Sequence, residues 1–249
     1  MITQHCFSVK YEDRRVLPIS TSYPLYSWLL SQIPGTFADL LHQQGEKPVS
    51  QYLRQERDQS IWTVSCLNSK AVSVLRPVLE RVSEIPLRNG VIKAELSDVR
   101  EICTIEELTS QAREKIHGAY CRMVFLTPTS FKHDGQYVIL PQTRLFLHSL
   151  AEKWSSSFPD YPQNDAETMD RMEKSLRVMD YRLRSCRFPL KGVQIPGFEG
   201  QISLRADLPV PLMDVWKSLA YYAEFSGVGM KTTLGMGGIQ LQTASQSVP

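Results

Sequence analysis

Twelve residues near the C-terminus, 227–238, combine glycines with one lysine in a pattern that could bind phosphate. Five of the 13 glycines fall in this segment, and Lys231 lies at its middle. Glycine tolerates positive φ and places no side chain between backbone and ligand, so successive N–H groups can point at a phosphate chain. The spacing matches neither a Walker loop nor a dinucleotide fingerprint. A structural turn between a helix and a strand explains the same pattern equally well.

A second candidate for phosphate binding is the basic segment 171–191. It contains seven basic and two acidic residues, whereas the whole chain has a formal net charge of only +2. Positive charge concentrated in this way predicts a partner with a phosphate backbone. Alternation along a strand places Arg182 and Arg184 on one face. The alternative is a solvated strand face, because exposed arginines are common.

His42 is the candidate for acid–base chemistry. It lies at the C-terminal end of a predicted helix, where the partial negative charge favours the protonated imidazole. A histidine there can act as a general acid or base near neutral pH, although a structural role is the alternative. No two histidines have metal-ligand spacing, and the carboxylates are scattered along the chain. The sequence therefore favours a reaction that needs no metal or other cofactor.

Composition narrows the class of protein. With 42% hydrophobic and 22% charged residues, the chain of 249 residues is globular. Its five cysteines are odd in number, far apart and without a CxxC pair, which is typical of reduced thiols. No apolar run approaches the ~18 residues of a membrane span, and the N-terminus lacks the pattern of a signal peptide. We therefore expect a cytoplasmic protein with no membrane partner.

Apolar periodicity predicts the element order strand, helix, strand, strand, helix, strand, repeated twice. In the first half the strands are 6–11, 49–55, 61–67 and 91–96, and the helices are 22–33, 36–45 and 71–82. The first helical segment is split by Pro34-Gly35, and Pro77 is expected to kink the last helix or move its start. A polar helix at 105–115 forms a connector.

In the second half the strands are 121–126, 181–187, 200–206 and 238–242, and the helices are 142–154 and 211–225. Residues 155–170 are expected to form a mobile loop that leads into a short helix. The repeated order predicts an α+β fold of two tandem ferredoxin-like (RRM-like) β-α-β-β-α-β domains, residues 1–118 and 119–249. This fold carries many unrelated functions, so it does not by itself decide the activity.

Several motifs together resemble one family, the CRISPR-associated repeat-cleaving endoribonucleases, which are family six of the Cas proteins within the RAMP superfamily. The segment 227–237 matches the family's G-h-G-x5-G-h-G loop, in which h is hydrophobic. Its glycine positions are occupied here by Gly227, Gly229, Gly235 and Gly237. Residues 196–200 are similar to the family's GF-x-G stretch, and 124–131 with 140–141 to its central segment. Residues 24–42 resemble the segment that carries the catalytic histidine.

The resemblance implies metal-independent cleavage of precursor CRISPR RNA within each repeat. The ribose 2′-OH attacks the adjacent phosphate and leaves a 2′,3′-cyclic phosphate and a 5′-OH. His42 would be the general acid or base, and the resemblance assigns assisting roles to Tyr26 and Lys47. The implied partners are the precursor repeat, the mature crRNA and a CRISPR effector complex.

Two alternatives belong to other classes of protein. A non-catalytic RAMP subunit would bind guide RNA in an effector complex and would have no need of His42. A metabolic enzyme on the same fold would require a concave pocket for a small molecule in place of an open basic surface.

Overall fold

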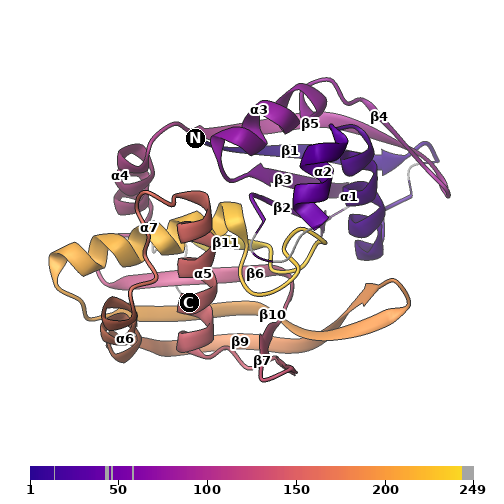
Figure 1. Cartoon of the computed structure of the whole chain (residues 1–249). Helices are drawn as coiled ribbons and strands as arrows, with labels where there is room; N and C mark the ends of the chain where they lie inside the picture. The colour runs from indigo at the N-terminus through magenta and orange to yellow at the C-terminus, as the bar shows by residue number, and fades with distance from the viewer. Residues whose placement is uncertain (14, 43–44, 46, 58, 243–249) are drawn as a thin grey trace.

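The protein, seen here in a computed structural model, is described over residues 1–242 apart from residues 14, 43–44, 46 and 58 (Figure 1). Two antiparallel sheets dominate it. The first is formed by β1 (Ile2–Tyr11), β2 (Val49–Glu56), β3 (Gln59–Cys66), β4 (Glu84–Leu87) and β5 (Gly90–Ile102). Their order in the sheet is β2-β3-β1-β5-β4. Without the edge strand β4, this is the strand order of a ferredoxin-like unit.

Three α-helices cover one face of the first sheet: α1 (Ser22–Ser31), α2 (Gly35–His42) and α3 (Ser69–Leu79) (Figure 1). A 3-10 turn, η1 (Ile19–Thr21), precedes α1. The α3 helix begins after Asn68, whose side chain accepts a hydrogen bond from the N–H of Ala71 and so caps the helix. Pro77 lies inside α3, so it neither begins nor ends the helix.

The second sheet repeats the topology. It contains β6 (Tyr120–Thr129), β9 (Leu176–Leu190), β10 (Val193–Ala206) and β11 (Ile239–Gln242), in the order β11-β6-β10-β9. The helices of this half are α5 (Thr143–Ser157), α6 (Ala166–Ser175) and α7 (Val210–Ser226). A small hairpin of β7 (Phe131–His133) and β8 (Gln136–Val138) follows β6. The prediction of two tandem ferredoxin-like units is confirmed.

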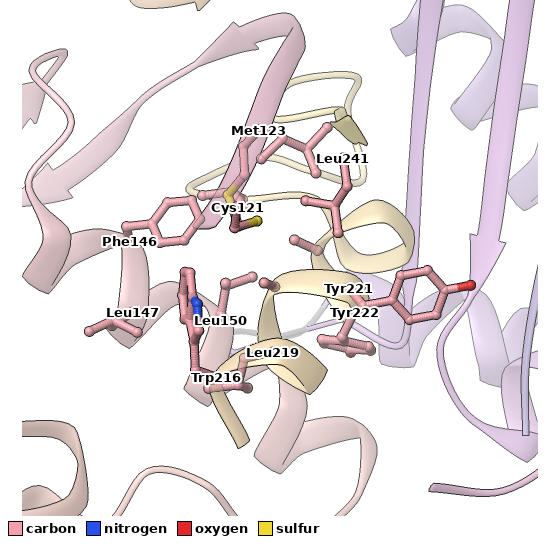
Figure 2. Close-up of a cluster of buried hydrophobic side chains, with 14 of the residues drawn as sticks. Cys121, Met123, Phe146, Leu147, Leu150, Trp216, Leu219, Tyr221, Tyr222 and Leu241 are labelled. Carbon is pink, nitrogen blue, oxygen red and sulfur yellow. The ribbon is translucent and has the colours of Figure 1, made fainter. Parts of the chain in front are cut away.

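The two units share a core, which fixes their relative position. Trp216 and Leu219 of α7 pack with Phe146 and Leu147 of α5 over the β6 side chain of Met123 (Figure 2). The same cluster of buried side chains includes three residues of the first unit: Ile2 of β1, Leu67 directly after β3, and Ile102 of β5. The connecting helix α4 (Ile105–Lys115) packs along α7. The domain boundary predicted at residue 118 falls between α4 and β6 and remains a prediction.

Strands β9 and β10 are longer than predicted and form a hairpin arm that reaches beyond the rest of the sheet (Figure 1). The arm turns at Lys191 and Gly192, both with positive φ, which matches the twist of a tight two-residue turn. Its end is apolar and packs through Phe188 and Ile195 against Tyr23 of α1. The arm therefore links the second unit to the first helix of the first unit.

Candidate functional site

The glycine loop, residues 227–238, connects α7 to β11, and its glycines are needed for contacts within the protein. Gly237 has a φ of 73°, and a Cβ there would lie 2.1 Å from the carbonyl oxygen of Val228. Gly229 has a φ of 77°, and its Cβ would lie 2.3 Å from the carbonyl oxygen of Ser130. Both positions are therefore closed to any residue with a side chain. The structural interpretation of the loop thus explains its glycines without a ligand.

Hydrogen bonds inside the protein occupy most N–H groups of the glycine loop. Gly229 donates to the hydroxyl of Ser149 at 2.8 Å, and Met230 donates to the carbonyl of Ser130 at 2.9 Å. The N–H groups of four residues, Lys231, Thr232, Thr233 and Gly235, donate to no residue in the part of the chain that the structure describes. The expected phosphate-binding N–H groups are thus limited to the tip of the loop, around Lys231.

Gln51 of β2 fastens this tip to the first unit. Its backbone N–H donates to the carbonyl of Thr232 at 2.9 Å, and its Nε2 donates to the carbonyls of Thr233 and Ser22 at 2.9 and 3.1 Å. Trp62 Nε1 donates to the remaining acceptor, Gln51 Oε1, at 3.0 Å. Gln51 is buried, so this satisfied network holds the loop in one position beside α1 and β2.

Tyr26 of α1 lies against the same tip. Its side chain is only 5% exposed. Burial raises the pKa of Tyr26 to about 12, although a hydrogen bond to the Thr233 side chain acts in the opposite direction. The phenol is therefore protonated at neutral pH and can donate a hydrogen bond, but it cannot serve as a base there.

His42 is the last residue of α2, and its side chain is exposed. Phe37 and Leu41 are buried on the opposite side and anchor the helix to the sheet. The half-buried Lys47 lies five residues further along, just before β2. His42 and Lys47 lie on the stretch of chain between α1 and β2. Both α1 and β2 contact the tip of the glycine loop.

The predicted basic strand is β9, at the edge of the second sheet. Arg182 and Arg184 are exposed and pair across the ladder with Gln201 and Glu199. Arg184 forms an ion pair with Glu199 at 2.8 Å, and this hydrogen-bonded partner raises the pKa of the guanidinium. The expected shared face of the two arginines is observed, and Arg182 carries the less neutralised charge.

Sequence reasoning missed two further arginines on this face. Arg122 of β6 and Arg205 of β10 lie on it, and Arg122 Nε donates to Ser203 of β10 at 3.2 Å. Arg205 stacks over Tyr120 and pairs with Asp207. Arg122 precedes β9 by more than fifty positions, and Arg205 lies on the neighbouring strand β10. Only the register of the sheet therefore brings the four arginines to one face.

A cleft of about 330 Å³ separates the open face of the first sheet from β11. Arg54, Arg100 and Lys115 bring positive charge to it, and Asp98 and Glu224 bring negative charge. Arg100 pairs with the buried Glu224 at 2.9 Å and also donates to the hydroxyl of Tyr221. This ion pair joins the two units at the floor of the cleft.

Two findings concern other kinds of site. Within the described residues, no three His, Cys, Asp or Glu side chains gather closely enough to hold a metal ion. No helix in that part of the chain is both long and apolar enough to span a membrane.

Comparison with known proteins shows which family this chain resembles. The sequence profile of the family described as CRISPR-associated endoribonuclease Cas6 matches residues 123–239. The CRISPR-associated endoribonuclease Cas6 of Streptococcus thermophilus is 29% identical over 240 residues, which cover 95% of this chain and 96% of that protein. The chain is similar to Cas6 endoribonucleases over almost its whole length. The Cas6 endoribonuclease of Mycobacterium tuberculosis strain H37Rv is 28% identical over 228 residues, 88% of this chain and 70% of that protein.

Solved structures agree with this Cas6 assignment. A Cas6 product complex superposes with a TM-score of 0.76 at 26% identity, covering 97% of this chain and 100% of the other. Thermus thermophilus Cas6 gives a TM-score of 0.72 at 26% identity, with 97% and 98% of the two chains covered. The predicted family and its endoribonuclease class are confirmed. The roles of individual residues in this protein remain predictions.

Proposed function

We propose that this protein, which is similar to Cas6 endoribonucleases, cuts precursor CRISPR RNA within its repeats, without a metal ion, and so produces mature crRNA. The observation that carries the proposal is the joint between the two units. The glycine-loop tip with Lys231 is fastened by Gln51 and Tyr26 to the segments on either side of His42. We infer that a phosphate bound at this tip is within reach of the exposed His42 on the stretch between these two segments.

These groups suit the reaction that the resemblance implies. The 2′-oxygen attacks the adjacent phosphorus, the bond from phosphorus to the 5′-oxygen breaks, and a 2′,3′-cyclic phosphate forms. The proton of the 2′-OH is lost to a base, and the departing 5′-oxygen gains a proton to become a 5′-OH. His42 is accessible to solvent and suits one of these transfers. Lys47 supplies positive charge for the phosphorane.

Tyr26 has a narrower role. Because its pKa is raised to about 12, its hydroxyl keeps the proton and can donate a hydrogen bond to a phosphate oxygen, but it cannot take a proton from the 2′-OH. The activity is therefore not expected to depend on ionisation of this phenol between pH 6 and 9, a range far below that pKa.

RNA binding falls mainly to the second unit. The four arginines on the open face of β6, β10 and β9 offer contacts to the phosphate backbone, and such contacts dominate affinity for RNA. Thermus thermophilus Cas6 shares the fold at 26% identity, and a Cas6 protein at the same identity has been solved as a product complex, which supports RNA as the ligand. A CRISPR effector complex remains a predicted partner.

The proposal is tested by incubating the protein with candidate repeat RNA in EDTA and mapping the product ends. We expect cutting at one position, with a 2′,3′-cyclic phosphate upstream and a 5′-OH downstream. A substrate with a single 2′-deoxy nucleotide at that position should be bound but not cut. Cleavage of the deoxy substrate, or a strict requirement for Mg²⁺, would contradict the mechanism.

A further inference from the structure

A groove of about 650 Å³ runs between α1 and the turn that joins β4 to β5. Its walls are aromatic and polar, with Tyr23 and Trp28 of α1 on one side and Pro86, Arg88 and Asn89 of the turn on the other. Tyr11 of β1 lines the groove beside Gly90, next to this turn. The volume lies within the range of pockets that hold drug-sized ligands. None of the residues assigned to the cleavage reaction lines it.

Trp28 is the most informative of these side chains. The other three tryptophans of the chain, Trp62, Trp154 and Trp216, are at most 2% exposed. Trp28 is only partly buried, and it packs edge-on against Trp62 with ring centroids 6.3 Å apart. The indole is thus held in place from behind while part of it faces the groove. A fixed and partly exposed aromatic ring is a suitable platform for stacking of a base.

The charges around the groove favour an anion. Among the described residues that line it, Arg88 is the one with a charged side chain, and it is exposed. Two further cations lie over its tyrosines: Lys191 is 4.6 Å from the ring centroid of Tyr23, and the Arg15 guanidinium is 5.2 Å from that of Tyr11. Arg15 is paired with Asp13, so Arg88 and Lys191 supply most of the field. Basic side chains between aromatic rings are typical of surfaces that bind single-stranded nucleic acid.

The position of the groove connects it with the proposed cleavage site. One side of α1 faces the glycine loop, where the Ser22 carbonyl accepts from Gln51 and Tyr26 contacts Thr233. Another side carries Tyr23, Ser27 and Trp28 into the groove. Tyr23 also packs in the cluster that contains Met236 of the glycine loop and Phe188 of the hairpin arm. A strand that leaves the glycine-loop tip therefore has to pass only the width of α1, about 10 Å, to enter the groove.

We propose that this groove binds an unpaired stretch of the RNA substrate next to the cleaved position, with bases stacked on Trp28 and Tyr23 and a phosphate on Arg88. The inference rests on the proposed function and adds a binding site to it. The competing occupant is a proline-rich peptide, which also docks in aromatic grooves. The substrate's negative charge and the absence of any carboxylate among the described lining residues favour RNA.

The test uses the full chain and repeat RNA made uncleavable by a 2′-deoxy nucleotide at the cut position. Three forms are compared: the repeat ending at the cut, and the repeat carrying a short oligouridine tail on either side. We expect one tail to tighten binding about tenfold and to quench tryptophan emission, because stacking on an aromatic ring contributes at that scale. Trp28→Phe should remove most of the quench, since the three buried tryptophans are shielded from the base.

Arg88→Ala is the decisive variant, because the exposed Arg88 lies in a turn and its loss should not affect folding. We expect it to reduce the gain from the tail, because a phosphate contact is lost, and to leave the affinity for the untailed repeat unchanged. Trp28→Ala should do the same in protein shown to be folded. Tyr161→Ala, which removes an exposed aromatic ring from the second unit, is the matched control and should keep the full gain from the tail.

Each other outcome is decisive. The inference is overturned if neither tail changes affinity or emission, or if Arg88→Ala weakens tailed and untailed RNA equally. Quenching by a proline-rich peptide, with none by tailed RNA, would assign the groove to a protein partner instead. If the wild-type protein does not bind the untailed repeat, and does not cut the unmodified repeat in the cleavage test above, the proposed function fails and the inference falls with it.

Discussion

The two ferredoxin-like units have the same strand order, but their first crossovers carry different side chains. In the first unit, α1 and α2 end at the exposed His42 and lead into β2. In the second unit, α5 and α6 end at the basic strand β9, where Arg182 and Arg184 are exposed. In the proposed function, the same place in the fold supplies a group for proton transfer in one unit and contacts to the RNA backbone in the other. Fold topology therefore does not determine the chemistry, and the joint between the units must bring the two functions together.

The largest loss is expected when that joint is disturbed. In Gly237→Ala the new Cβ would meet the carbonyl of Val228 in a backbone with a φ of 73°, so the loop must shift or strain. Strain of this kind costs about 1–3 kcal/mol, which lowers Tm by several degrees in a chain of this size. We expect lower Tm in thermal unfolding, and a loss of RNA binding and of cleavage beyond what the unfolded fraction explains.

Lys231→Ala is the matched variant for the joint, because it removes a charge at the loop tip. It should weaken repeat-RNA binding and leave Tm unchanged. If Lys231→Ala binds RNA normally, and Gly237→Ala binds in proportion to its folded fraction, the loop is only a structural turn and RNA contacts the protein elsewhere.

A smaller effect is expected from the arginines of the second unit. Arg182→Ala with Arg184→Ala should weaken RNA binding and reduce the slope of log Kd against log salt by up to about 1.4, since each phosphate contact contributes about 0.7 with single strands. Arg182 should account for more of the change, because Glu199 neutralises Arg184. The control is Arg81→Ala, at an exposed position beyond α3. An unchanged slope in the double variant would leave β9 as a solvated surface.

The fold and the candidate site were predictable from the sequence to different degrees. The helix and strand periodicities indicated both units, because apolar faces repeat along each element. The short edge strand β4 was not predicted, because its four residues are too few to show an alternating apolar pattern. It is defined by its pairing with β5 across the turn at Arg88 and Asn89. Pro77 was expected to disturb its helix, yet α3 continues to Leu79.

Long-range register and packing limited the prediction of the site. Arg122 and Arg205 join the basic face only through the pairing of β6 with β10. The glycine pattern indicated a close approach of the backbone, but the sequence could not say whether a ligand or Val228 and Ser130 fill the space beside the glycines. Gln51 gave no signal, because one polar residue in a strand is unremarkable until its partners are known.

The smallest predicted effect concerns the stability of the first unit. His5 of β1 is fully buried, and neither ring nitrogen has a hydrogen-bond partner among the described residues. Burial, aided by the charge of Arg76, lowers the pKa of His5 below its usual 6.5. The unfolded chain therefore binds a proton that the folded chain resists, so stability should fall as pH drops below about 6.5, by at most about 1.4 kcal/mol per pH unit.

His5→Phe should flatten this dependence in denaturant unfolding measured between pH 7.5 and 5. For each protein, the free energy of unfolding is expressed relative to its own value at pH 7.5. A difference in packing between histidine and phenylalanine then cancels, and only the pH dependence is compared. If the slope is the same in both proteins, His5 is already protonated in the folded state or the acid sensitivity arises elsewhere.

The central claim is that the first unit cuts the RNA that the second unit binds, and His42→Ala tests it most directly. Single-turnover cleavage and Kd are measured on the same repeat RNA for the variant and the wild type. We expect the rate to fall about 10²-fold or more, the scale of a lost acid or base, while Kd is essentially unchanged because backbone contacts dominate binding. Cleavage by His42→Ala at the wild-type rate, or a rate loss that merely follows weakened binding, would contradict the account.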